Sequence, residues 1–200
     1  MKQITSLIAA AALSLSLSAC SGGSSAASKL NGTWTGEPVA IDGDSVSIDG
    51  ISVYTFDYHG QKHGNVALSS MLSIDAPLCP TDSLLSTGWI TAAGLASMQG
   101  TYSLRDNGIA LKLDPATFQL IIDDEATRLT FDTVNPEEMP GYTDMRDSCA
   151  KVLRNSLPEL IRDNMLRDTI MSDITFTNDI FTALLPSSSD PVTFRRQIQE

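Results

Sequence analysis

Residues 51–58 read ISVYTFDY, and this stretch is the clearest indication of the fold class. Apolar and polar side chains alternate along it, and most of its residues favour extended backbone. Residues 59–62 (His-Gly-Gln-Lys) suit a tight turn, and residues 64–74 supply a second strand. The stretch therefore predicts a β-hairpin with one buried face.

Short segments of the same kind recur on both sides of this hairpin. Further strands are expected at 33–41, 87–94, 98–104, 109–113, 118–122, 128–131, 172–176, 179–185 and 191–196. The Asn-Gly pair within residues 106–108 tolerates positive φ and favours a hairpin turn. The segments 118–122 and 128–131 are short and give weaker signals. About nine strands, joined mostly by short turns, remain without them and predict a mainly-β, up-and-down antiparallel β-barrel, because closing a sheet removes its exposed edges.

Residues 142–170 have helical spacing instead. Apolar side chains recur there every three or four residues, at Met145, Cys149, Val152, Leu153, Leu157, Leu160, Ile161 and Met165. Pro158 interrupts the run, so we expect two helices, or one helix kinked near Ser156. This helical insertion is predicted to pack on or across the barrel.

The amino terminus has the pattern of an export signal. Residues 1–20 read MKQITSLIAAAALSLSLSAC, with a positive Lys2 and an apolar run too short to span a bilayer. The segment Leu17-Ser18-Ala19-Cys20 resembles the bacterial lipobox. This resemblance implies that residues 1–19 are a lipoprotein signal peptide, and that acylated Cys20 anchors the chain to the lipid membrane. An ordinary signal peptide with an incidental cysteine is the alternative.

Residues 20–29 are then expected to comprise the lipidated cysteine and a flexible tether, because residues 21–28 read SGGSSAAS. Residues 30–200 would form the folded domain. By resemblance to known sorting signals, Ser21 after the anchor favours the outer membrane of the cell envelope, with the domain facing the periplasm.

Two further cysteines, Cys79 and Cys149, remain in the mature chain. In an oxidising compartment these two could form a disulfide between a loop and the helical segment. The alternative is a pair of separate buried thiols.

The two ends of the folded domain carry a second resemblance. Gly32-Thr33-Trp34 begins the first strand as Gly-x-Trp, and Phe194-Arg195-Arg196 closes the last as Phe-x-Arg. This combination resembles the lipocalins and the wider calycin group. The resemblance implies that Trp34 packs at the closed end of the barrel under a guanidinium, that of Arg196 or alternatively Arg195. Gly32, Trp34 and Arg196 are then structural closure residues. The sequence departs from the lipocalin pattern in one respect. Three strands are expected after the helical segment, where lipocalins have one.

Sequence motifs give little support to catalysis or to metal binding. His59 and His63 flank a turn, with Asp57 as a weak third ligand, and are better read as a solvated hairpin tip. Residues 148–151 match Ser-x-x-Lys but lack the companion motifs of penicillin-binding enzymes, so chance explains the match. The acidic residues 123–125 suit a solvated turn. We therefore expect a non-enzymatic protein without a metal or cofactor.

A small apolar or amphipathic ligand inside the barrel is the leading functional expectation. Inward aromatic side chains would line its site: Tyr54, Phe56, Trp89, Tyr102 and Phe118. The alternatives are an envelope structural or interaction module with a filled barrel, and an accessory or inhibitory protein of an exported enzyme. A cavity above roughly 300 Å³ would favour the ligand, and a packed interior beneath an exposed apolar patch would favour the module.

Overall charge restricts the partners. The formal net charge is −11, which repels phosphate backbones and argues against nucleic acid. The sequence indicates no particular protein partner.

Overall fold

The computed structural model describes residues 26–42, 46–59, 62–78, 88–105, 107–131, 135 and 138–198. The expected signal peptide (1–19), Cys20 and Cys79 lie outside these residues. In chain order, the elements are α2 (Ala26–Leu30), β1 (Gly32–Asp42), β2 (Ser47–Tyr58), β3 (His63–Pro77), β4 (Gly88–Arg105), β5 (Gly108–Phe131), α3 (Tyr142–Ser156), α4 (Pro158–Arg167), β6 (Ile170–Thr177), β7 (Ile180–Leu184) and β8 (Val192–Arg196).

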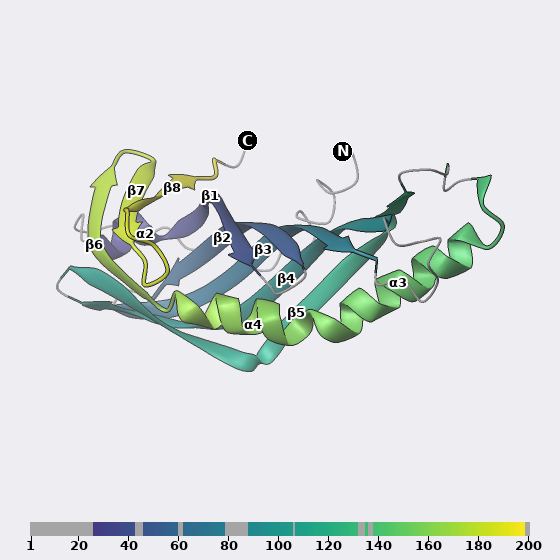
Figure 1. Cartoon of the computed structure of the whole chain (residues 1–200). Coiled ribbons are helices and arrows are strands. Elements are labelled where there is room, and N and C mark those ends of the chain that lie inside the picture. Colours follow the sequence, from purple (N-terminus) through teal and green to yellow (C-terminus); the bar gives the residue numbers. More distant parts are fainter. Residues whose placement is uncertain are drawn as a thin grey trace.

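Eight antiparallel strands form one ring-like sheet (Figure 1). Each strand pairs with the next along the chain, and β8 pairs with β1 to close the ring. β2 to β4 pair over nearly their whole lengths, whereas the β5–β6 and β8–β1 seams contain three residue pairs each. The mainly-β antiparallel prediction is confirmed, with eight strands in place of about nine.

β4 and β5 are longer than the sequence predicted. Two strands, 87–94 and 98–104, were expected with a turn after Gly94, but the chain forms one continuous β4 in which Gly94 lies opposite Ile122 of β5. The three short strands expected between 109 and 131 are one strand, β5, with two irregularities at 114–119 and 123–128 where its register with β4 shifts. Extra residues on one strand bend it and increase its twist without ending it, and this curvature helps the sheet to close.

Aspartates hold both irregularities in place. The carboxylate of Asp114 accepts a hydrogen bond from the backbone N–H of Ala116 (3.0 Å), and that of Asp123 accepts one from Glu125 (2.9 Å). Such local hydrogen bonds stabilise a turn-like backbone in place of the regular hydrogen bonds between neighbouring strands. The acidic stretch 123–125 is therefore part of a bulged strand, and Asp124 forms an ion pair with Arg154 of α3.

The helical segment consists of two helices that cross one side of the curved sheet (Figure 1). α3 ends at Ser156, and Pro158 occupies the first turn of α4, where its missing N–H costs nothing. Leu153, Leu157 and Ile161 form one stripe that is buried in the common core. The predicted break at the proline is confirmed. Among the described residues, no helix is both long and apolar enough to cross a membrane.

Trp34 closes one end of the ring. Its side chain has no exposed surface, and its indole N–H donates to the carbonyl of Leu30 in α2 (2.7 Å). Arg196 lies over the indole with its guanidinium carbon 4.3 Å from the ring centroid. This is the arrangement that the Gly-x-Trp and Phe-x-Arg motifs implied, with Arg196 as the cation and not Arg195.

The same guanidinium fixes the segment before β1. It donates to the carbonyl oxygens of Asn31 (2.6 Å) and Lys29 (2.5 Å). Residues 26–29 were expected to belong to a flexible tether, but they form part of α2. Arg196 and Trp34 hold the end of this helix by donating hydrogen bonds to the carbonyl oxygens of Lys29 and Leu30. Gly32 has a φ of 120°, and a β-carbon there would lie 2.8 Å from Arg196 Nη1. Glycine is therefore required at this close approach.

Candidate functional site

Three of the five predicted lining residues point into the ring. Tyr54, Phe56 and Tyr102 are buried, with Tyr54 and Phe56 stacked at a centroid distance of 6.0 Å. Phe56 meets Tyr102 edge-to-face at 5.3 Å. These rings contact one another and form part of the core, so they fill the ring interior where they were expected to line a cavity.

The other two predicted lining residues lie elsewhere. Trp89 is 51% exposed, because its neighbours Gly88 and Ile90 take the inward positions of β4 and successive side chains alternate. Its assignment to the interior is therefore wrong. Phe118 lies in the first irregularity of β5 and is only half-buried, packed against the core from that bulge.

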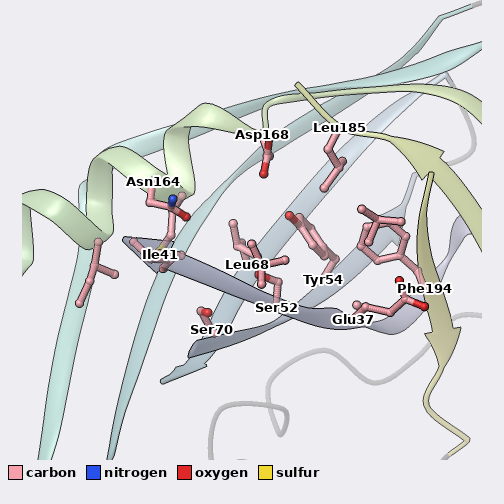
Figure 2. A pocket seen from close by; sticks show the side chains of 16 residues that line it. Glu37, Ile41, Ser52, Tyr54, Leu68, Ser70, Asn164, Asp168, Leu185 and Phe194 are labelled. Carbon is pink, nitrogen blue, oxygen red and sulfur yellow. The ribbon is translucent and has the colours of Figure 1, made fainter. Parts of the chain in front are cut away.

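A small cavity lies where the pairing between β1 and β8 ends. β8 pairs with β1 only as far as Gly36, and beyond this point α4 and Leu185, which follows β7, face residues of β1, β2 and β3. We call this the seam pocket (Figure 2). Apolar side chains such as Leu68, Ile161 and Phe194 form its walls, and six polar residues converge on it: Glu37, Ser52, Tyr54, Ser70, Asn164 and Asp168. Its cavity volume is about 30 Å³.

The polar groups of the seam pocket are neutral or already engaged. Burial raises the pKa of the Tyr54 hydroxyl, and the charge of Asp168 raises it further, whereas a hydrogen bond from Ser52 opposes the shift. Asp168 itself accepts hydrogen bonds from the backbone N–H (3.0 Å) and the hydroxyl (2.6 Å) of Ser187. Figure 2 shows Asp168 at the end of α4, pointing toward Tyr54. A phenol with a raised pKa stays protonated at neutral pH, so the Tyr54 hydroxyl can donate a hydrogen bond but supplies no phenolate base there.

Size limits what the seam pocket holds in this state. A cavity of this volume accommodates about one water molecule. Sites for drug-sized ligands typically enclose about 300–1,000 Å³. The seam pocket therefore offers no room for such a ligand unless α4 moves away from the sheet.

A larger depression lies on the opposite, outer face of the sheet, near the β2–β3 and β4–β5 turns. We call it the outer hollow, and its cavity volume is about 420 Å³. The residues that line it are His59, His63, Gly64, Asn65, Thr101, Tyr102, Ser103, Ala110 and Lys112. Sequence alone does not indicate this site, because its residues come from three separate segments and only the strand register brings them together.

The two histidines take different positions in the outer hollow. His59 Nε2 lies 3.2 Å from the carboxylate of Asp57 and 3.1 Å from Asn65 Nδ2. His63 lies across from Ser103 of β4. In the part of the chain that the structure describes, no group of three histidine, cysteine, aspartate or glutamate side chains could hold a metal ion.

Cys149 lies half-buried on α3 and forms no disulfide within the described residues. Burial raises the pKa of this thiol. Because Cys79 lies outside the described residues, the disulfide between the two stays a prediction, as does the acylation of Cys20.

Tyr102 carries a polar atom for which the interior offers no partner. Its hydroxyl oxygen is buried and makes no hydrogen bond within the described residues. Burial raises the pKa of Tyr102 to about 12, with added effects of Asp57 and Tyr58. A buried hydroxyl without a partner costs stability, about 1–3 kcal/mol.

Replacing this residue, Tyr102→Phe, is expected to leave stability at neutral pH unchanged or slightly higher. The alkaline behaviour should change more clearly. Tyr102 loses its proton near pH 10 in the unfolded chain but only near pH 12 in the folded protein, so raising the pH between these values favours unfolding. Urea unfolding at neutral pH and at pH 10–11 would show a smaller alkaline loss in the variant. A loss of stability at neutral pH would instead indicate that the hydroxyl has a partner.

The chain matches no protein-family model, and a comparison with curated proteins finds no match either.

Proposed function

We propose that the chain is a lipid-anchored, non-enzymatic interaction module of the bacterial cell envelope, built on a lipocalin-like ring with a filled interior. The small volume of the seam pocket, about 30 Å³, is the observation that carries this proposal. Small-molecule sites typically enclose at least ten times that volume. The interior aromatic rings contact one another and contribute to the core instead of surrounding a ligand.

The outer face supports the same proposal. One cross-strand row of outward side chains is apolar along five successive strands, and its members are Pro38, Ile51, Met71, Leu95 and Ile121. Ile121 is 49% exposed. Scattered exposed apolar residues need no explanation, but a contiguous row is typical of proteins that meet a partner.

Likeness to the lipocalins is part of this proposal. The sequential antiparallel order of the strands and the contact between Trp34 and Arg196 support it. The three strands after α4 and the narrow seams beside β6 and β8 are departures from a simple lipocalin plan.

Anchoring through Cys20 rests on the lipobox-like sequence. α2 begins six residues after this cysteine, and six residues of extended chain span about 20 Å. Because α2 packs beside Trp34, the anchor would hold the closed end of the ring near the bilayer surface.

A second candidate is the binding of an amphipathic ligand at the seam pocket, favoured by the six polar residues that converge there. The polar end of such a ligand would meet Tyr54 and Asn164. Its apolar part would have to displace α4, because the pocket itself is too small.

Native mass spectrometry of the acylated protein, purified from its own envelope, separates the two candidates. We expect the mass of the acylated chain with no bound molecule, and no saturable binding of a fluorescent fatty acid. The substitution Ser70→Leu narrows the seam pocket. Saturable one-to-one binding of the fatty acid by the wild type, abolished in this variant, would contradict the filled ring. Ser189→Leu, at an exposed position in the loop between β7 and β8, serves as the matched control.

A further inference from the structure

Basic side chains gather at one end of the outer face, although the protein is acidic overall, with a net charge of −11. Lys112 and Arg105 point outward beside the outer hollow, from β5 and β4. Neither forms an ion pair with a described residue. Two cations without an acidic partner among the described residues are a local exception on an acidic surface, and cations of this kind attract anionic groups.

The strand register places polar donors beside Lys112. Asn65 pairs with Thr101, which pairs with Lys112, so their side chains form one row across β3, β4 and β5 on the outer face. The next row contains His63, Ser103 and Ala110 in the same order. Because alternate residues of a strand face the same side, both rows face the outer hollow.

Shape also suits a small bound group. The outer hollow has a cavity volume of about 420 Å³, within the range of small-molecule sites. Ala110 and Ser103 are paired neighbours on β5 and β4, and both contribute short side chains to the lining of the hollow.

Two carboxylates near the outer hollow could oppose an anion, and both already have partners. Asp57 lies in the same outward row, beside Asn65, and its carboxylate is 3.2 Å from His59 Nε2. Asp173, near the β4–β5 turn, accepts a hydrogen bond from Asn107 (2.9 Å). Both acids thus have partners of their own, while Lys112 has none among the described residues.

We propose that the outer hollow binds a phosphate group. Lys112 supplies the positive charge, and the hydroxyls of Thr101 and Ser103, with the imidazole of His63, donate hydrogen bonds to the phosphate oxygens. A compact ammonium with several hydroxyl and N–H donors suits a tetrahedral oxyanion, which accepts bonds from several directions.

The phosphate has two sources with the same chemistry, a soluble phosphate ester and a phospholipid headgroup. The outer hollow lies at the end of β2 where Asn31, just after α2, accepts a hydrogen bond from the backbone N–H of Tyr58 (3.0 Å). If Cys20 is anchored as proposed, this end of the ring lies near the bilayer. Only the headgroup source rests on that proposed function, whereas phosphate binding itself does not.

Titration of the acylated protein with inorganic phosphate, in a non-ionic detergent and a phosphate-free buffer, tests the site. We expect saturable shifts of the amide resonances of Thr101, Ser103 and Ala110. Lys112→Gln should weaken the binding by roughly tenfold, as expected for the loss of a charged hydrogen-bond donor. Lys151→Gln, which removes the same charge from an exposed position on α3, should bind like the wild type.

Vesicles separate the two sources. Acylated protein is reconstituted into phosphatidylcholine vesicles with and without phosphatidic acid, and the same resonances are followed. Shifts that appear with phosphatidic acid, and that added phosphate reverses, identify the headgroup. Shifts that appear only with soluble phosphate identify a soluble ester.

Absence of saturable shifts with either probe, or wild-type affinity in Lys112→Gln, would overturn the proposal. The titration with inorganic phosphate reports on the outer hollow and not on the seam pocket, so its outcome is independent of the test of the filled ring.

Discussion

Truncation of the buried indole, Trp34→Ala, is expected to lower the free energy of unfolding by about 3–5 kcal/mol. Trp34 is fully buried, and its ring meets Phe181 edge-to-face with centroids 4.8 Å apart. Its removal leaves a cavity between α2 and the final strands, and it leaves the guanidinium of Arg196 without its aromatic partner. Reversible urea unfolding, followed by circular dichroism, measures the loss.

The chain provides a matched control for this variant. Trp89 is the other tryptophan, and its side chain is 51% exposed on the outer face of β4. Trp89→Ala should change stability by less than about 1 kcal/mol, since surface substitutions away from special features have small effects. A near-neutral Trp34→Ala, or equal losses in both variants, would contradict the role of Trp34 in closing the ring.

The difference between these tryptophans also shows where sequence reasoning reached its limit. Trp34 could be placed because it begins a strand beside a glycine, in a motif with a partner at the other end of the domain. Trp89 could not be placed, because alternation tells which residues share a face but not which face is buried. In β4 the register against β3 and β5 decides this, and it puts Ile90 inside.

Local sequence signals predicted the presence of the helices and strands better than they predicted the lengths of these elements. The hairpin around residues 59–62 and the helix break at Pro158 follow from the chemistry of a few neighbouring residues. Gly94 and the segments 114–119 and 123–128 carry the same turn chemistry, yet the chain continues through them as strand. Neighbouring strands on both sides of β4 supply backbone hydrogen bonds that outweigh a local preference for a turn.

The two candidate sites depend on contacts between distant segments. The seam pocket needs α4 opposite β1, and the outer hollow needs the register of β3, β4 and β5. Tyr54 could be chosen as an inward residue, because alternation places it on one strand face with the aromatic Phe56. The place of three other residues in these sites could not be predicted, because nothing local in their segments specifies the residues that they face. These three are Asp168, Lys112 and His63.

Substitution of the proposed anchor, Cys20→Ser, is expected to release the protein from membranes into the soluble fraction. The lipobox-like sequence implies two or three acyl chains on Cys20, and each buried CH₂ group contributes about 0.8 kcal/mol to membrane binding. Serine keeps the size of the side chain but removes the sulfur that would carry a thioether-linked lipid. Fractionation of cells, with mass spectrometry of the amino-terminal peptide, measures both the location and the acylation.

Cys149→Ser is the matched control, because it makes the same chemical change at a half-buried position on α3. This variant should stay in the membrane fraction with the acyl mass intact. If Cys20→Ser also stayed there after a high-salt wash, the chain would be held by something other than Cys20. The exposed apolar row from Pro38 to Ile121 would then be the first surface to test.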